Sequence, residues 1–125
     1  MVVLDTCALI ALVGEEPMLS KKTMQHIEQG AYILSISFAE IACKMKLGKL
    51  KMSLTASDLY REFSLVPTID ILAIGVDEWL HAVEMDWSEN RDPADRVLVA
   101  FAKRKKLPIV TSDAKITSFY SAVMW

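Results

Sequence analysis

The chain has 125 residues, of which 53% are hydrophobic and 24% charged, and its formal net charge is −2. This length and composition predict a single globular domain over residues 1–125 and exclude a disordered chain. No apolar run approaches the ~18–20 residues of a membrane span, and no signal peptide is evident, so we expect a cytoplasmic protein. The slight acidic excess argues, taken alone, against a surface that binds nucleic acid.

Apolar segments with strand character alternate with segments of helical pattern along the whole chain. In order we expect a strand at 1–4, helices at 6–13 and 20–29, a strand at 31–35, helices at 37–47 and 55–65, an extended segment at 69–74, helices at 76–85 and 92–105, a strand at 108–111, a turn or short helix at 113–120 and an extended segment at 122–125. This alternation predicts a three-layer α/β/α fold, with helices on both faces of a central, mainly parallel sheet.

Acidic side chains follow several of the predicted strands. Asp5 follows the first strand, Glu40 lies in the first turn of the helix after the second strand, and Asp113 follows the strand at 108–111. Asp95 also lies in the first turn of a helix, although the sequence does not reveal the strand before it. Because sites in open α/β sheets form at the carboxyl ends of the strands, we expect these carboxylates to face one crevice.

Each of these acids has a simpler explanation when it is considered alone. Ser37 and Glu40 have the spacing of a capping box, and Asp92 and Asp95 have the spacing of an N-cap and a third helical residue. The two acids that directly follow strands are also placed to cap the next segment. Acids in first turns are common because they interact favourably with the helix dipole. Only the combination of four acids points to chemistry.

Four carboxylates in one crevice favour a bound cation. Carboxylates within about 4–6 Å repel one another and raise one another's pKa values by a unit or more. Oxygen ligands without accompanying soft ligands favour Mg²⁺ or Mn²⁺. An ion held in this way activates a water and stabilises the leaving oxygen of an in-line phosphodiester displacement. The acids therefore predict a metal-dependent nuclease, whose cation also offsets the acidic net charge where phosphate binds.

Four motifs in order span nearly the whole chain. They are Leu4-Asp5-Thr6-x-Ala8-Leu9-Ile10; Ser37-x-x-Glu40-Ile41-x-x-Lys44, continuing to Leu47-Gly48-Lys49-Leu50; Arg91-Asp92-Pro93-x-Asp95-Arg96-x-Leu98-x-Ala100-x-Ala102; and Leu107-Pro108-Ile109-Val110-Thr111-x-Asp113. With these motifs the chain resembles the PIN-domain ribonucleases, and most closely the VapC-type toxins of type II toxin–antitoxin modules.

The resemblance implies a PIN-like fold and a role for each matching residue. The catalytic and metal-binding residues would be Asp5, Glu40, Asp95 and Asp113. Thr6 and Thr111 sit where hydroxyl groups often support that cluster. The resemblance further implies Mg²⁺ or Mn²⁺ as the metal, RNA as the substrate, a cognate antitoxin that blocks the site, and a homodimer.

Three charged residues beside the site have more than one interpretation. Asp92 either assists or replaces Asp95, or it serves only as the N-cap; we favour Asp95 because it precedes the apolar run of its helix as in the family pattern. Lys44, one turn beyond Glu40, either contacts phosphate or pairs with Glu40 along the helix. Arg96 either contacts phosphate, orients a carboxylate, or has only a structural role.

Other features receive simpler predictions. The basic stretch Lys44, Lys46, Lys49 and Lys51 is the better candidate for RNA contact, because it begins near Glu40. The run from Lys103 to Lys106 is expected to be a solvated helix end. Cys7 and Cys43 are expected to be small buried hydrophobic residues without a chemical role.

Other functions remain open from the sequence alone. A phospho-acceptor receiver domain also binds Mg²⁺ at strand ends, but it requires paired acids after its first strand and a lysine after a late strand. Here Asp5 stands alone and Asp113 follows the late strand. A non-catalytic binding module with this fold would not need four acids. A PIN-type nuclease that processes RNA without being a toxin also stays open.

Overall fold

A wholly parallel sheet forms the centre of the protein. The computed structural model describes residues 1–14 and 18–125. Within these residues the strands are β1 (Val2–Leu4), β2 (Ala31–Leu34), β3 (Ile69–Leu72), β4 (Ile109–Val110) and β5 (Val123–Met124). They pair in the order β3-β2-β1-β4-β5, each parallel to its neighbours. The expected α/β class is confirmed, and the described sheet is parallel throughout.

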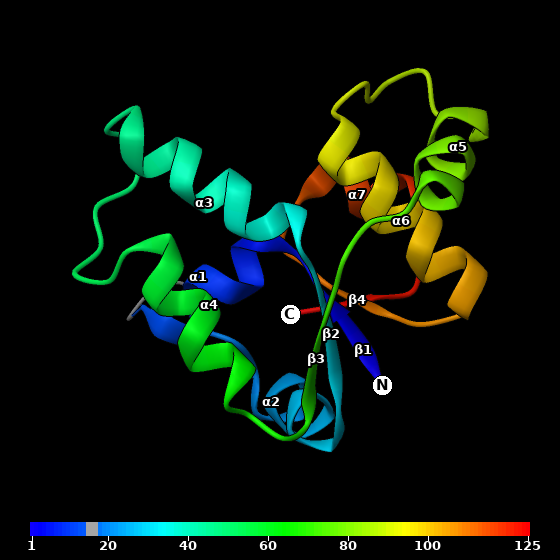
Figure 1. Ribbon diagram of the computed structural model, residues 1–125. Coiled ribbons are helices and arrows are strands. Elements are labelled where there is room, and N and C mark those ends of the chain that lie inside the picture. Colours follow the sequence, from blue (N-terminus) through cyan, green and yellow to red (C-terminus); the bar gives the residue numbers. More distant parts are fainter. Residues whose placement is uncertain (15–17) are drawn as a thin grey trace.

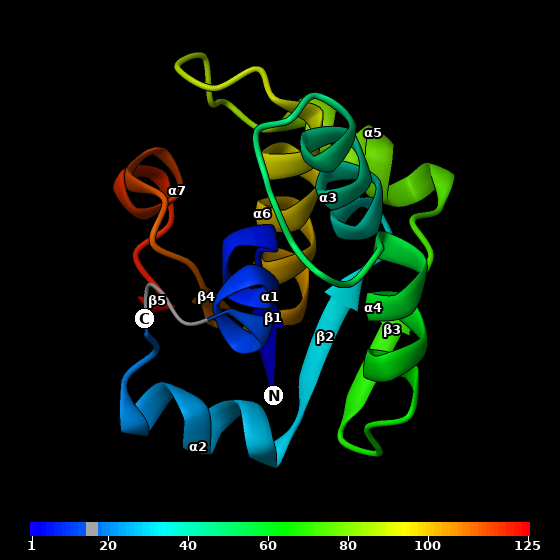
Figure 2. The same cartoon turned by 90° about the vertical axis from the view of Figure 1, so that its left-hand side faces the viewer.

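Helices cover both faces of this sheet (Figures 1 and 2). In the part of the chain that the structure describes, they are α1 (Thr6–Val13), α2 (Lys21–Gln29), α3 (Ile36–Lys46), α4 (Ala56–Ser64), α5 (Val76–Glu84), α6 (Pro93–Lys105) and α7 (Ala114–Phe119). Figure 1 shows α1, α3 and α4 on one side of the sheet and α5, α6 and α7 on the other. None of the described helices has the length and apolar character needed to span a bilayer.

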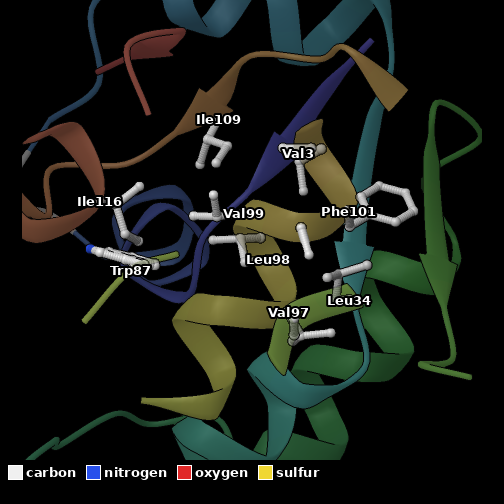
Figure 3. Packing of buried hydrophobic residues seen from close by; sticks show 12 residues of the cluster. Val3, Leu34, Trp87, Val97, Leu98, Val99, Phe101, Ile109 and Ile116 are labelled. Carbon is white, nitrogen blue, oxygen red and sulfur yellow. The ribbon is translucent and has the colours of Figure 1, made fainter. Parts of the chain in front are cut away.

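The core is divided by the sheet into two layers. Side chains alternate along β1, so Val3 packs into one layer while Val2 and Leu4 pack into the other. The centre of the first layer is α6, which buries every residue from Val97 to Ala102 (Figure 3). Because each fully buried aliphatic or aromatic side chain contributes about 1.5–3 kcal/mol, this helix is firmly held. Its first turn carries Asp95, whose backbone is therefore fixed relative to the sheet.

Three acids cap helices as their positions predict. Asp5, Asp92 and Asp113 each have extended backbone geometry and accept hydrogen bonds from backbone N–H groups at the starts of α1, α6 and α7. The predicted capping box at Ser37 and Glu40 is wrong. The helix α3 already begins at Ile36, with Ser35 as its N-cap residue, so both side chains lie inside the helix and bond elsewhere.

Candidate active site

Four carboxylates from different parts of the chain line one pocket. This pocket of about 380 Å³ lies at the carboxyl edge of the sheet. Its lining residues are Asp5, Thr6, Cys7, Glu40, Lys44, Asp95, Ser112, Asp113 and Ala114. Because parallel strands end at the same edge, the starts of α1, α3 and α7 meet there, and the start of α6, which follows α5 and not a strand, joins them. All four acids expected at one crevice are thus brought together.

Asp5 is the most deeply placed of the four acids, and it is held by donors from two separate segments of the chain. Its residue is only 8% exposed. Oδ1 accepts from the Thr6 backbone N–H at 2.7 Å, and Oδ2 accepts from the Thr111 hydroxyl at 2.7 Å. The Thr111 hydroxyl oxygen in turn accepts from the backbone N–H of Asp113 at 3.0 Å. Thr111 therefore connects two acids of the pocket without lining the pocket itself.

Glu40 is held by the residue that follows Asp5. The Thr6 hydroxyl donates to Glu40 Oε1 at 2.6 Å, and the Thr6 and Ser37 hydroxyl oxygens lie 3.1 Å apart. Thr6 and Ser37 are both buried. This contact joins α1 to α3, and it takes up the side chains that would otherwise have formed the predicted capping box.

Asp95 is held by Asn90, a residue that the sequence did not single out. The Asn90 amide nitrogen Nδ2 donates to Asp95 Oδ2 at 2.8 Å. Asp92 instead accepts from the backbone N–H groups of Ala94 and Asp95, at 2.9 and 3.5 Å. The structure therefore places Asp95 in the wall of the pocket and Asp92 at the helix cap. An asparagine two residues before an N-cap has the composition of an ordinary loop, so only the folded geometry distinguishes it.

Burial and mutual repulsion raise the pKa values of two of the acids. Desolvation is the largest cause for Asp95, whose pKa rises to about 6, and the nearby carboxylates of Asp92, Asp5 and Asp113 raise it further. Burial also raises the pKa of Glu40, with a smaller contribution from Asp5, while the Thr6 hydrogen bond opposes this shift. The pocket therefore disfavours its own negative charge and favours a cation that would compensate it.

The donor atoms of the pocket fit a hard divalent cation. Apart from the Cys7 thiol and the Lys44 ammonium group, the polar side chains that line it offer carboxylate and hydroxyl oxygens, which Mg²⁺ and Mn²⁺ prefer. In residues 1–14 and 18–125, no three acidic, cysteine or histidine side chains are grouped tightly enough to hold an ion as they stand. The chemistry of the donors and the raised pKa values support the fit. Asp5, Glu40, Asp95 and Asp113 are the residues that would hold the ion.

The two basic residues considered for the site are placed differently. Lys44 lines the pocket, where its charge lowers the pKa of Glu40. Arg96 does not line it. Its guanidinium donates to the backbone carbonyls of Ala82, Val83, Met85, Trp87 and Asn90. A planar group with five N–H donors suits such a set of carbonyls, so Arg96 fixes the connection between α5 and α6.

The remaining sequence predictions have mixed outcomes. Cys43 was expected to be buried, and this is wrong: it is exposed, because α3 turns other residues toward the core. Cys7 is half-buried in the pocket, and its thiol donates to Asp5 Oδ2 at 3.3 Å. At the basic helix end, Arg104 pairs with Glu78 at 3.4 Å and Lys106 ends α6 in a left-handed conformation with φ 55°.

An all-parallel α/β sheet with four acids at its carboxyl edge is a fold and a site suited to metal-assisted phosphodiester chemistry. The chain belongs to the PIN domain family, whose model matches residues 2–121. The resemblance seen in the four motifs is thereby confirmed. Membership of this family implies a nuclease, and PIN domains generally depend on divalent metals. The receiver-domain alternative is not supported.

Several solved structures have a similar fold, and one of them is a toxin–antitoxin complex. A toxin–antitoxin complex from Klebsiella pneumoniae is similar with a TM-score of 0.65 and 19% identity, covering 100% of this chain and 97% of that chain. FitAcB from Neisseria gonorrhoeae is similar with a TM-score of 0.66 and 19% identity, covering 100% of this chain and 97% of that chain. FitAB bound to an IR36 DNA fragment is similar with a TM-score of 0.64 and 19% identity, covering 99% of this chain and 94% of that chain. At this identity the similarity establishes the fold alone. Among curated proteins, none matches the chain.

Proposed function

We propose that this protein is a Mg²⁺- or Mn²⁺-dependent endoribonuclease that acts as the toxin of a type II toxin–antitoxin module. The observation that carries the proposal is the single pocket lined by Asp5, Glu40, Asp95 and Asp113 in a PIN domain. Its catalytic and metal-binding residues are these four acids. RNA in the cytoplasm is the proposed substrate, and hydrolysis leaves a 5′-phosphate on one product.

The side chains divide the work of the site between them. A bound divalent ion would supply an activated water and stabilise the leaving oxygen. Asp5 presents a carboxylate that is already fixed by Thr6 and Thr111, so little side-chain entropy is lost when it binds a ligand. Thr6 keeps Glu40 directed toward the same pocket. Lys44 adds a positive charge to the wall, where it would attract a phosphate of the substrate.

Cleavage of RNA by wild-type and variant protein tests the assignment of the site. Purified protein is incubated with structured RNAs and Mg²⁺ or Mn²⁺, and Asp5→Asn and Asp113→Asn are compared with Asp70→Asn. Asp70 is an exposed acid of β3 outside the pocket, which makes it a matched control. We expect the two pocket variants to lose cleavage and the control to retain it. If wild type and Asp5→Asn leave the same residual cleavage, the site assignment is wrong.

The toxin role rests on the fold and needs its own test. One of the similar structures is described as a toxin–antitoxin complex, and another, FitAB, is described as bound to a DNA fragment. We therefore propose a cognate antitoxin that binds this chain and blocks the pocket. Induced expression should arrest growth, Asp5→Asn should not, and co-expression of a small neighbouring gene for a DNA-binding protein should restore growth. Cleavage without growth arrest would favour the second candidate, an RNA-processing nuclease that is not a toxin.

We further propose that the protein is a homodimer formed through α5. Val76, Leu80 and Val83 lie along one side of this helix and are 73%, 56% and 76% exposed. A contiguous apolar surface of this kind favours a protein partner, and a second copy supplies a matching surface. Leu80→Glu should shift the mass in light scattering from dimer to monomer, whereas Leu65→Glu, at an exposed apolar residue beyond α4, should not. A monomeric wild type would contradict the proposal.

A further inference from the structure

Asn90 is a buried polar residue that lies behind the proposed metal site. It is 3% exposed, and it does not line the pocket. Both ends of its side-chain amide are used. Nδ2 donates to Asp95 Oδ2 at 2.8 Å, and Oδ1 accepts from the backbone N–H of Asp92 at 2.9 Å. The amide therefore connects the loop before α6 to one specific oxygen of Asp95.

The backbone that carries Asn90 is fixed as well. Arg96 Nη1 donates to the Asn90 carbonyl at 2.9 Å and to the Trp87 carbonyl at 2.6 Å. Trp87 is itself buried and stacks on Phe119 of α7, with ring centroids 4.6 Å apart and an interplanar angle of 9°. Asn90 thus approaches Asp95 from a segment that is held by a guanidinium on one side and by an aromatic stack on the other.

The direction of the Asn90 amide matters because Asp95 shares the pocket with three other acids. Repulsion from Asp5 and Asp113 favours rotation of the half-buried Asp95 carboxylate away from them. A donor placed on Oδ2 opposes this rotation and leaves Oδ1 for a ligand. Groups that orient metal ligands in this way are known to alter metal affinity by about 10–100-fold when they are removed.

We propose that Asn90 is a positioning residue that orients the Asp95 carboxylate for metal binding. The inference rests on the proposed function, because that function makes Asp95 a metal ligand. A purely space-filling role would be satisfied by leucine, which has a similar shape and no polar groups. The requirement for an amide donor therefore separates positioning from packing.

Calorimetric titration with Mn²⁺ tests this in the full chain without relying on cleavage. Asn90→Leu and Asn90→Ala should bind Mn²⁺ about 10-fold more weakly than wild type, or weaker still. Tyr120→Phe is the matched control, since it removes a hydroxyl that donates to the carbonyls of Leu107 at 2.7 Å and Ala102 at 3.4 Å, at the end of α7 that lies away from Asp113. It should lower the melting temperature while the Mn²⁺ affinity stays unchanged. Asp95→Asn sets the affinity expected when this ligand is lost.

The outcomes separate the inference from the function on which it rests. If Asp95→Asn weakens Mn²⁺ binding and both Asn90 variants bind like wild type, the positioning role is overturned while the metal site stands. If Asp95→Asn binds like wild type, the metal-site assignment fails and the inference fails with it. Should the Asn90 variants not fold, nuclear magnetic resonance decides. The side-chain amide signals of Asn90 should shift on addition of Mg²⁺ and in Asp95→Ala, and signals that stay fixed in both cases would overturn the proposal.

Discussion

Thr6 donates its hydroxyl hydrogen to Oε1 of Glu40 across 2.6 Å. The donor is the first residue of α1, and the acceptor lies in α3, so the contact joins two helices that follow different strands. The preceding residue, Asp5, uses its own carboxylate to accept from the Thr6 backbone N–H. One residue therefore controls the orientation of two acids of the pocket, through its backbone and through its side chain.

Replacing Thr6 by valine should impair the site with little change of shape. The half-buried Glu40 would lose the bond that favours its charged form, so its pKa should rise further. We expect a loss of about 1–3 kcal/mol in the free energy of unfolding, measured by denaturant titration, together with weaker Mn²⁺ binding at neutral pH. Thr6→Ser keeps the hydroxyl and is the control. Equal unfolding free energies and equal Mn²⁺ affinities of the valine and serine variants would show that the Thr6–Glu40 hydrogen bond contributes to neither stability nor metal binding.

The raised pKa of Asp95 predicts how stability depends on pH in the absence of metal. Its ordinary pKa is 3.8 and its folded pKa is about 6, so between these values the folded protein binds more protons than the unfolded chain. The free energy of unfolding should therefore fall as the pH rises through this window. The penalty is absent below pH ~4 and complete above pH ~6, and it amounts to about 1–2 kcal/mol after allowance for solvent screening.

Asp95→Asn isolates this contribution because the variant cannot be charged at this position, while its amide oxygen can still accept from Asn90. Above pH ~6 the variant should be more stable than wild type, and below pH ~4 the two should have similar stability. Added Mg²⁺ should reverse the order at neutral pH by stabilising only wild type. A constant difference between wild type and variant across the whole pH range would contradict the prediction.

The parts of the fold and site that depend on local sequence could be predicted. Short apolar runs and amphipathic segments gave the alternation of strands and helices, and parallel strands place the residues that follow them at one edge. Asp5 and Asp113 were therefore found from their positions alone, since Asp5 directly follows β1 and Asp113 follows β4 after two residues. Glu40 could be placed by the same argument, because its helix follows β2 at once.

The parts that depend on long-range contacts could not be predicted. The Ser37 and Glu40 pattern matched a capping box, but the Thr6 hydroxyl comes from another helix and takes up both side chains. The acceptors of Arg96 lie on α5 and in the loop after it, and no periodicity in the sequence reveals them. Cys43 was expected to be buried because its neighbours in the sequence are apolar. In the folded helix only residues on the other face of α3 contact the core.

Arg96 should be important for stability, in contrast to exposed arginines. Arg96→Met would remove the guanidinium donor from five backbone carbonyls of the α5–α6 connection. Hydrogen bonds to charged groups contribute about 1.5–3 kcal/mol each, but bonds that share one guanidinium do not add up fully. We therefore expect a total loss of about 3 kcal/mol or more in the free energy of unfolding. Arg96→Lys should recover little of it, because an ammonium group lacks the planar array of donors.

Arg61→Met provides the matched control for Arg96. Arg61 pairs with Asp58 at 2.9 Å, but its side chain is 72% exposed. Exposed pairs of this kind contribute about 0–1 kcal/mol. Denaturant titration of both variants under the same conditions should therefore separate them clearly. Similar losses for the two methionine variants would mean that the contacts of Arg96 with the loop contribute no more than a surface ion pair.

The basic stretch at the end of α3 should contribute to RNA binding through charge alone. Lys44 lines the pocket, and Lys49 is exposed a short distance beyond it. In an Asp5→Asn background, which should bind without cleaving, Lys44→Ala and Lys49→Ala should each weaken binding to different RNAs to a similar extent. For a single-stranded substrate, each change should reduce the slope of log affinity against log salt concentration by about 0.7.

Lysines at the other end of the molecule provide the control for this measurement. Lys21 and Lys22 are exposed at the start of α2, which Figure 2 shows at the opposite end of the sheet from α3. Removing either one changes the net charge by the same amount as removing Lys44. A difference in salt slope between the α2 variants and the α3 variants therefore reports the position of the charge and not the net charge of the protein. If the α2 variants reduced the salt slope as much as the α3 variants, RNA would be attracted by the overall charge of the protein, and the assignment of Lys44 and Lys49 to the RNA-binding surface would be wrong.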